Sequence, residues 1–190
     1  MPTLDYPLTL LCHPATPAPM VRTVEAQAAI TAEGCLTIAY RLWGDMARLV
    51  VPEPYNPERT DRLWERTCFE AFIGVAGSTA YREFNLSPSG QWAAYAFSDY
   101  RQPEQSAAPN IAPQITTHRF AGRLEIEATI PADALPAGRS LHIALSAVIE
   151  ATDTVDGSHS YWALHHAAER PDFHQREAFI LELAAPHKAA

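Results

Sequence analysis

The sequence is poor in cysteine, in basic residues and in long apolar runs, and each shortage excludes a class of protein. Its three cysteines, Cys12, Cys35 and Cys68, form no C-x-x-C pair, which argues against a zinc ribbon or a dithiol redox centre. We expect them to behave as small buried apolar residues in a reducing compartment, although one disulfide with a spare thiol remains open.

Positive charge is also scarce. Fourteen Lys and Arg against 22 Asp and Glu give a net charge of −8, and the basic residues are scattered. Neither nucleic acid nor an anionic membrane is therefore an expected partner. No apolar run approaches the ~20 residues that span a bilayer, and Leu8–Cys12 is too short for an export signal. We expect a cytoplasmic protein.

What the chain does have is apolar residues and proline. The 47% apolar content suffices for a core, and sixteen prolines suit many short strands divided by turns. The sequence predicts one domain over residues 1–190. Its fold class is all-β, an antiparallel β-sandwich of jelly-roll type with about nine to eleven strands.

Alternating apolar residues mark the individual strands. Val21–Thr31 fits either a strand or a short helix, because alanine is indifferent to the choice. A hairpin is predicted around Ala121-Gly122, and a single helical turn over Pro131–Pro136. The remaining predicted strands cover Leu8–Cys12, Cys35–Gly44, Leu141–Glu150, Ser160–Leu164 and Ala178–Leu183.

The most informative segment is Trp64–Phe97. Turn sequences at 76–78 and 87–90 divide it into an antiparallel meander of three strands. Residues two apart share a face, so Glu83 and Asn85 project together, and pairing could bring Glu70 close to Glu83. Two carboxylates at this spacing need a cation, an arginine such as Arg41 or Arg66, or a hydroxyl-rich ligand between them.

Aromatic and histidine side chains could complete a site. Trp92 and Trp162 are candidate platforms for a sugar ring, although sandwiches routinely bury tryptophan. Four histidines near the C-terminal end, with Asp172, could hold a metal, but hydrogen bonding within loops is the favoured interpretation. His165 is expected at a pocket edge, and no metal or cofactor is predicted. The four are His159, His165, His166 and His174.

Two groups of residues resemble a known family. They are W-E-x-x-C-F-E-A-F-I from Trp64 with Y-x-E-F-N-x-S-P-x-G-x-W from Tyr81, and the tail segments Tyr161–His165 and Pro171–His174. These are similar to DOMON-like proteins related to family 9 carbohydrate-binding modules. The resemblance implies a β-sandwich whose relatives bind sugars or, in some branches, haem. The chain lacks the Asp- and Asn-rich run of the calcium loops in secreted modules.

The sequence therefore predicts a non-catalytic domain that binds a small polar ligand, most plausibly a saccharide. The predicted ligand-binding residues are Arg41, Glu70, Glu83, Asn85, Trp92, Trp162 and His165. Two alternatives stay open. One is a glycoside-active or metal-assisted hydrolase that uses Glu70 and Glu83, and the other is a protein-interaction module.

Overall fold

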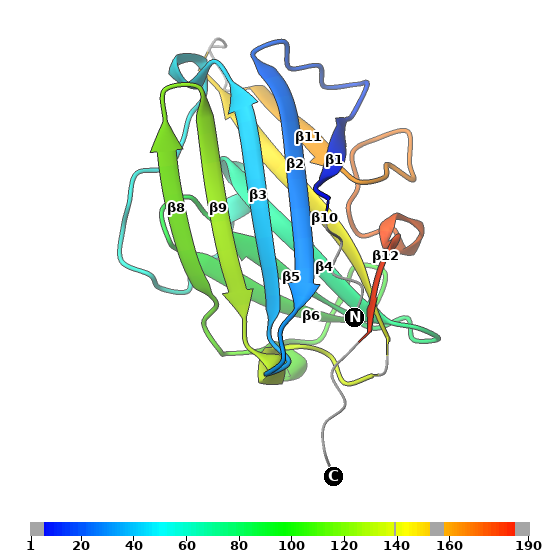
Figure 1. Cartoon of the computed structure of the whole chain (residues 1–190). Helices are drawn as coiled ribbons and strands as arrows, with labels where there is room; N and C mark the ends of the chain where they lie inside the picture. The colour runs from blue at the N-terminus through cyan, green and yellow to red at the C-terminus, as the bar shows by residue number, and fades with distance from the viewer. Residues whose placement is uncertain (1–5, 139, 153–157, 185–190) are drawn as a thin grey trace.

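In the computed structural model, which describes residues 6–138, 140–152 and 158–184, two antiparallel sheets pack face to face (Figure 1). Sheet A lies in front in this view, and the strands of sheet B cross behind it at an angle. Sheet A contains, in spatial order, β1 (Leu8–Cys12), β2 (Val21–Ile30), β3 (Leu36–Gly44), β9 (Arg123–Ile130) and β8 (Gln114–Phe120).

Sheet B is larger and carries the meander in its centre. Its spatial order is β7 (Gln102–Pro103), β6 (Trp92–Asp99), β5 (Tyr81–Leu86), β4 (Cys68–Val75), β10 (Ser140–Ala151) and β11 (Ser158–Ala163), and β12 (Leu181–Ala184) pairs with the first residues of β10. Short 3₁₀ turns connect the strands: η1 (Met46–Arg48), η2 (Leu63–Glu65), η3 (Gln105–Ala107), η4 (Ala132–Ala134) and η5 (Arg176–Ala178).

Strand β1 joins the two sheets. Its first residues, Leu8 to Leu10, pair with β2 in sheet A, whereas Leu11 and Cys12 pair with β11 in sheet B. A strand that changes sheets in this way closes one corner of a sandwich. Strand β1 therefore ties the two sheets together around one core.

The core lies between the inner faces of the sheets, as the alternation predicts. In sheet A the inward residues of β9 are Leu124, Ile126, Ala128 and Ile130, all nearly inaccessible. Tyr40 of β3 crosses this core, and its hydroxyl donates a hydrogen bond of 2.6 Å to the Glu70 backbone carbonyl. This bond satisfies a buried hydroxyl and ties sheet A to the centre of sheet B.

The all-β sandwich and the three-stranded meander are confirmed. Val21–Ile30 is a strand rather than a helix, and the predicted hairpin and helical turn are present as β8–β9 and η4. β7 is a strand of only two residues. The three cysteines are free, although only Cys68 is fully buried.

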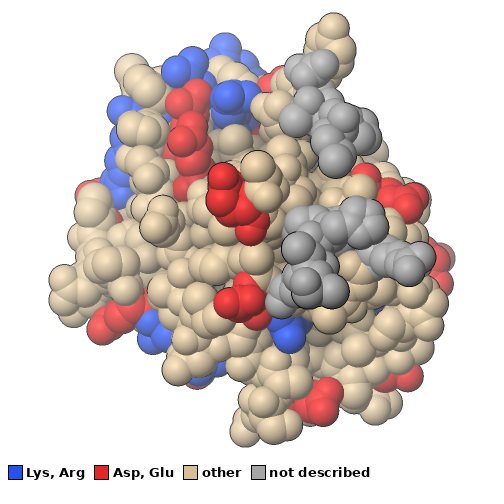
Figure 2. Space-filling view, turned by 60° about the horizontal axis from the view of Figure 1, so that its bottom comes forward, with Lys and Arg blue, Asp and Glu red and all other residues tan. Residues whose placement is uncertain are grey.

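The surface mixes charges of both signs. Figure 2 shows Lys and Arg gathered at one edge of the viewed face beside a row of Asp and Glu, with uncharged residues over most of the remainder. Among the described residues, none of the helical segments has the length and apolarity that crossing a bilayer requires.

Candidate ligand-binding site

The outer face of sheet B is covered by other parts of the chain. Residues 164–180, here called the strap, run across it and pack Phe173, Ala178 and Phe179 against Phe72 of β4 and Tyr81 of β5. On the other side, Leu63 of η2 packs on Cys68 and Ala93. Polar side chains occupy the middle of the face, between these two apolar clusters.

Four of these side chains form a polar floor. In the strand register Glu70 lies between Asn85 and Ser146, and Glu83 is opposite Phe72, one step along the same face. Glu70 and Glu83 are therefore diagonal neighbours. The exposed fractions of Glu70, Glu83, Asn85 and Ser146 are 3%, 6%, 0% and 1%.

Two members of the floor lack partners. Within the described part of the chain, neither a hydrogen bond nor an ion pair reaches the Glu70 carboxyl, and the Ser146 hydroxyl oxygen is buried without a partner. Buried polar groups are nearly always satisfied, because an unmade hydrogen bond costs about 1–3 kcal/mol. The pair therefore marks a place where the fold is polar without a structural need.

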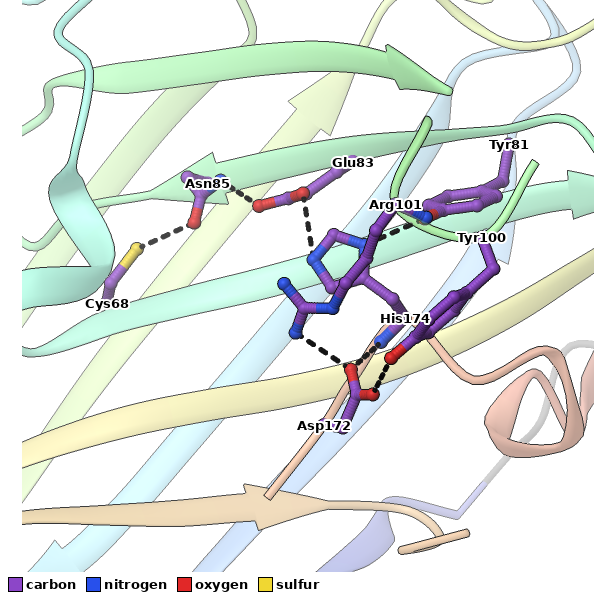
Figure 3. A network of polar contacts seen from close by, with 8 residues as sticks. All are labelled: Cys68, Tyr81, Glu83, Asn85, Tyr100, Arg101, Asp172 and His174. Atoms are coloured by element: carbon purple, nitrogen blue, oxygen red, sulfur yellow. Dashed lines mark hydrogen bonds and ion pairs between the residues drawn. The ribbon is translucent and has the colours of Figure 1, made fainter. Parts of the chain in front are cut away.

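Glu83, in contrast, is held in place. The Asn85 amide Nδ2 donates to Glu83 Oε1 at 2.6 Å, and Cys68 Sγ lies 3.6 Å from Asn85 Oδ1. On the other side His174 Nε2 from the strap is 3.8 Å from Glu83 Oε2 (Figure 3). The carboxyl thus sits between a sheet residue and a strap residue.

The His174 ring is oriented by Tyr81. The backbone N–H of Arg101 donates to the Tyr81 hydroxyl oxygen at 3.2 Å, so the hydroxyl proton is free to be donated to His174 Nδ1 at 2.8 Å. In the neutral ring Nδ1 is then the acceptor and Nε2 carries the proton. That proton faces Glu83.

A clasp of three residues closes the face above Glu83. Arg101 has left-handed backbone geometry, with φ of 51°, at the turn between β6 and β7, and its Nη2 contacts Asp172 Oδ1 of the strap at 2.9 Å. The Tyr100 hydroxyl donates to Asp172 Oδ2 at 2.6 Å. Figure 3 shows the guanidinium in front of His174, bound to Asp172 rather than to a glutamate.

Burial and mutual repulsion perturb the titration of these groups. Burial, followed by the nearby Glu83 charge, raises the pKa of Glu70 well above its usual value. Burial raises the pKa of Glu83 to about 7, against lowering by the Asn85 hydrogen bond and Arg101. Burial and then the Arg101 charge lower the pKa of His174 to about 4. Near neutral pH the histidine is therefore neutral, Glu70 holds its proton and Glu83 is partly protonated.

Aromatic side chains line the rim beside Glu83. Tyr95 of β6 is the register neighbour of Glu83, and its ring meets that of Trp64 edge to face with centroids 5.9 Å apart. Trp64 remains 40% exposed. The Tyr95 hydroxyl donates to Asp61 at 2.8 Å, and the Arg59 guanidinium lies 5.7 Å from the ring centroid. An exposed aromatic pair thus adjoins the buried polar floor.

The structure brings together only part of the predicted site. Glu70, Glu83 and Asn85 lie side by side, but Trp92 and Trp162 point into the core between the sheets, where they are 5% and 6% exposed. Neither tryptophan can act as a platform on this face.

Arg41 and His165 are also displaced from the predicted place. Arg41 is in sheet A and pairs with Glu125 at 3.5 Å, so it cannot neutralise Glu70. Arg66 pairs with Glu150 at 2.8 Å. His165 is an exposed strap residue with no contact to the floor among the described residues. His174, further along the strap, is the histidine that reaches the site.

Ser146 and Arg101 are site residues that the sequence analysis missed. Ser146 is the single polar residue within the apolar run Ile143–Ile149, and this interruption is a signal that could have identified it. Arg101 carries no such signal, because it follows a strand and precedes a polar loop. Its role depends on a contact with Asp172, 71 residues away.

The other histidines are engaged by the backbone. His159 Nε2 contacts the Glu65 carbonyl at 3.0 Å, and His166 Nε2 contacts that of Leu11 at 2.8 Å. In the described ranges, no three His, Cys, Asp or Glu side chains gather closely enough to hold a metal ion.

A cavity of about 270 Å³ lies elsewhere in the molecule. It is lined by residues that include Thr16, Met20, Leu49, Ile149 and Ser160, and no carboxylate or arginine contributes to the lining. Hollow shape alone does not define a binding site. The polar residues of this lining are Thr16, Ser158, His159 and Ser160, and His159 already contacts the Glu65 carbonyl. The outer face of sheet B carries the groups with perturbed pKa values and the buried, unpaired Ser146 hydroxyl, and it is therefore the candidate site.

Comparison with known proteins supports the fold. No family model and no curated protein matches the chain. Among solved structures, a Bacteroides uniformis protein provisionally described as carbohydrate-binding superimposes with a TM-score of 0.63 at 17% identity, over 94% of this chain and 84% of that one.

A family 9 carbohydrate-binding module from Caldicellulosiruptor kristjanssonii is also similar. Its complex with glucose gives a TM-score of 0.56 at 7% identity, covering 96% of this chain and 86% of that one. Its complex with cellotriose gives 0.56 at 7%, covering 95% and 84%. The finer DOMON-like assignment stays a prediction. At the level of the fold, the chain is a β-sandwich of the kind found in family 9 carbohydrate-binding modules.

Proposed function

We propose that this protein binds a saccharide, without catalysis, over the polar floor of sheet B. The observation that carries the proposal is the unpartnered Glu70 carboxyl beside the unpartnered Ser146 hydroxyl. A ligand hydroxyl can donate to the first and accept from the second, and this would satisfy both. Asn85, directly opposite Glu70, and Glu83, one register step further along, offer additional acceptors.

The rim supports a sugar in particular. A pyranose ring combines hydroxyl edges with apolar C–H faces, and the exposed ring of Trp64 beside Tyr95 offers an apolar surface for such a face. The structural neighbours add weight, since one of them is a family 9 module in complex with glucose and with cellotriose.

Entry of a ligand requires the clasp to open. Arg101 is held over the floor through Asp172, and 53% of its side chain is exposed, whereas the Asp172 side chain is 13% exposed. Such a partly solvated ion pair contributes about 1 kcal/mol or less, and the Tyr100–Asp172 hydrogen bond contributes about another 1 kcal/mol. A saccharide can offset this loss with a few hydrogen bonds to the floor.

The geometry disfavours glycoside hydrolysis. Glycosidases place two carboxyls on opposite sides of the scissile bond. Here Glu70 and Glu83 project from adjacent strands of one sheet, on the same side. A ligand lying on this face of the sheet would therefore contact both carboxyls from the same side.

Titration of glucose and cellotriose, followed by calorimetry and tryptophan fluorescence, tests the proposal. We expect saturable binding that Trp64→Ala weakens about tenfold, since stacking on an aromatic ring contributes about 1 kcal/mol. Phe120→Ala is the matched control, because Phe120 is a 47% exposed aromatic residue of sheet A and should leave binding unchanged. Absence of binding to a panel of neutral and charged mono- and oligosaccharides would refute the proposal.

A further inference from the structure

The polar floor has more carboxyl groups than the chain has cations to pair with them. Glu70, Glu83 and Asp172 are three carboxyls around one arginine, Arg101. Arg101 forms its ion pair with Asp172, so neither glutamate has an arginine or lysine partner among the described residues. The nearest cationic candidate for Glu83, His174, is neutral near pH 7.

The free acceptors are arranged for a group with several donors. The Ser146 oxygen is buried without a partner in the described chain, and the Glu70 carboxyl beside it makes no hydrogen bond there. Glu83 has one oxygen bound by Asn85 and the other at 3.8 Å from His174. An ammonium group offers three N–H donors and a positive charge, whereas a hydroxyl offers one donor. Charge-assisted bonds to carboxylates are about twice as strong as neutral ones.

Building on the saccharide-binding function proposed above, we propose that the ligand carries a primary amine, as in an amino sugar, and that its ammonium group binds between Glu70 and Glu83 beside Ser146. The rest of the ring would lie toward Tyr95 and Trp64. A metal ion is the less suitable occupant, because the described residues provide two carboxyls here rather than a cluster of three or more ligating groups.

Binding of an ammonium would release a proton. In the free protein near neutral pH, Glu70 retains its proton and Glu83 is partly protonated. The other groups facing them do not exchange in this range: burial raises the pKa of the Cys68 thiol and of the Tyr81 and Tyr95 hydroxyls, His174 is neutral, and Arg101 and Asp172 are paired. An arriving ammonium would therefore displace a glutamate proton.

Calorimetry with glucosamine, glucose and N-acetylglucosamine at pH 7, in two buffers of different ionisation enthalpy, tests this. We expect glucosamine to bind on the order of tenfold more tightly than the two neutral sugars. Its observed enthalpy should depend on the buffer, corresponding to release of up to about one proton, and that of glucose should not. Glu70→Gln should remove most of the preference, and Glu127→Gln, at an exposed position of sheet A, should retain it.

The outcomes separate this inference from the general function. Equal binding of glucose and glucosamine without proton release would overturn the ammonium site and leave saccharide binding intact. Glucosamine binding that survives both Glu70→Gln and Glu83→Gln would also overturn it. No binding of any sugar would remove both proposals. Because the preference and the proton release are measured on the wild-type chain, the test stands even if a variant fails to fold.

Discussion

The buried carboxyls should make the protein less stable as pH rises, and Glu83→Gln measures this effect. The pKa of Glu83 is about 7 in the folded chain, against 4.5 for an unperturbed side chain. Between these values the folded state binds more protons than the unfolded state, so the Glu83 contribution to the free energy of unfolding falls with pH. The loss is complete above pH 7 and amounts to about 3 kcal/mol.

His174 has the opposite effect on the pH dependence of stability, so its contribution must be separated from that of Glu83. Its pKa is lowered from 6.5 to about 4, so its contribution to stability is lost as pH falls through that range. The two effects largely cancel in the wild-type profile between pH 4.5 and 6.5. The difference between Glu83→Gln and wild type is therefore the informative quantity, because the His174 contribution is common to both.

Urea unfolding at pH 5, 6, 7 and 8 provides that difference. We expect Glu83→Gln to match wild type near pH 4.5 and to be more stable by about 3 kcal/mol at pH 8. Asn85 can still donate to the amide oxygen of the new side chain. Glu127→Gln, on an exposed part of β9, should show no such trend. A Glu83→Gln variant destabilised equally at every pH would refute the reasoning.

Three further substitutions test the covering elements. Asp172→Asn breaks the ion pair with Arg101, and hydrogen exchange should show faster opening of residues 164–180 with about 1 kcal/mol lost in urea unfolding; unchanged exchange would contradict the clasp. Phe173→Ala, at an 8% exposed position, should reduce stability by about 3 kcal/mol, and a loss below about 1 kcal/mol would mean that the strap is not packed. Gly74→Ala places a Cβ 1.8 Å from Arg176 Nη1, so that side chain must leave its carbonyl acceptors. We expect a Tm decrease of a few degrees, which an unaltered Tm would refute.

Local pattern predicted the strands well, because alternation reports which face of a strand is buried. The inward residues of β9 and the three strands of the meander follow directly from period two. Alanine-rich β2 stayed ambiguous because alternation fits a strand whereas alanine is a strong helix former, a preference that the sequence analysis treated as neutral. Its pairing with β1 on one side and β3 on the other makes this segment a strand.

The face of a residue beyond a turn was harder to predict. Trp92 follows the turn Ser87–Gly90, and the pairing of Leu86 with Trp92 places it on the core side with Leu86, not on the floor side with Asn85. A change of one residue in such a turn exchanges the two faces of the next strand. The local sequence alone does not determine which face of the sheet each residue after the turn takes.

Contacts between segments that are distant in the chain could not be predicted from the sequence. Glu70 and Glu83 were expected to lie close together, and the register places them as diagonal neighbours, with Asn85 directly opposite Glu70. The strap brings Asp172 and His174 over β5, and its contacts with Tyr81 and Arg101 span 93 and 71 residues. Such contacts depend on how the whole sandwich closes.

Mapping backbone amide shifts in an NMR titration with glucosamine, and with glucose beside it, tests the central claim most directly. The account predicts that the perturbed amides cluster in β4 around Glu70, in β5 around Glu83 and at Arg101, with sheet A unaffected. Shifts confined to β2, β3 and β9, or no shifts at saturating sugar, would contradict it.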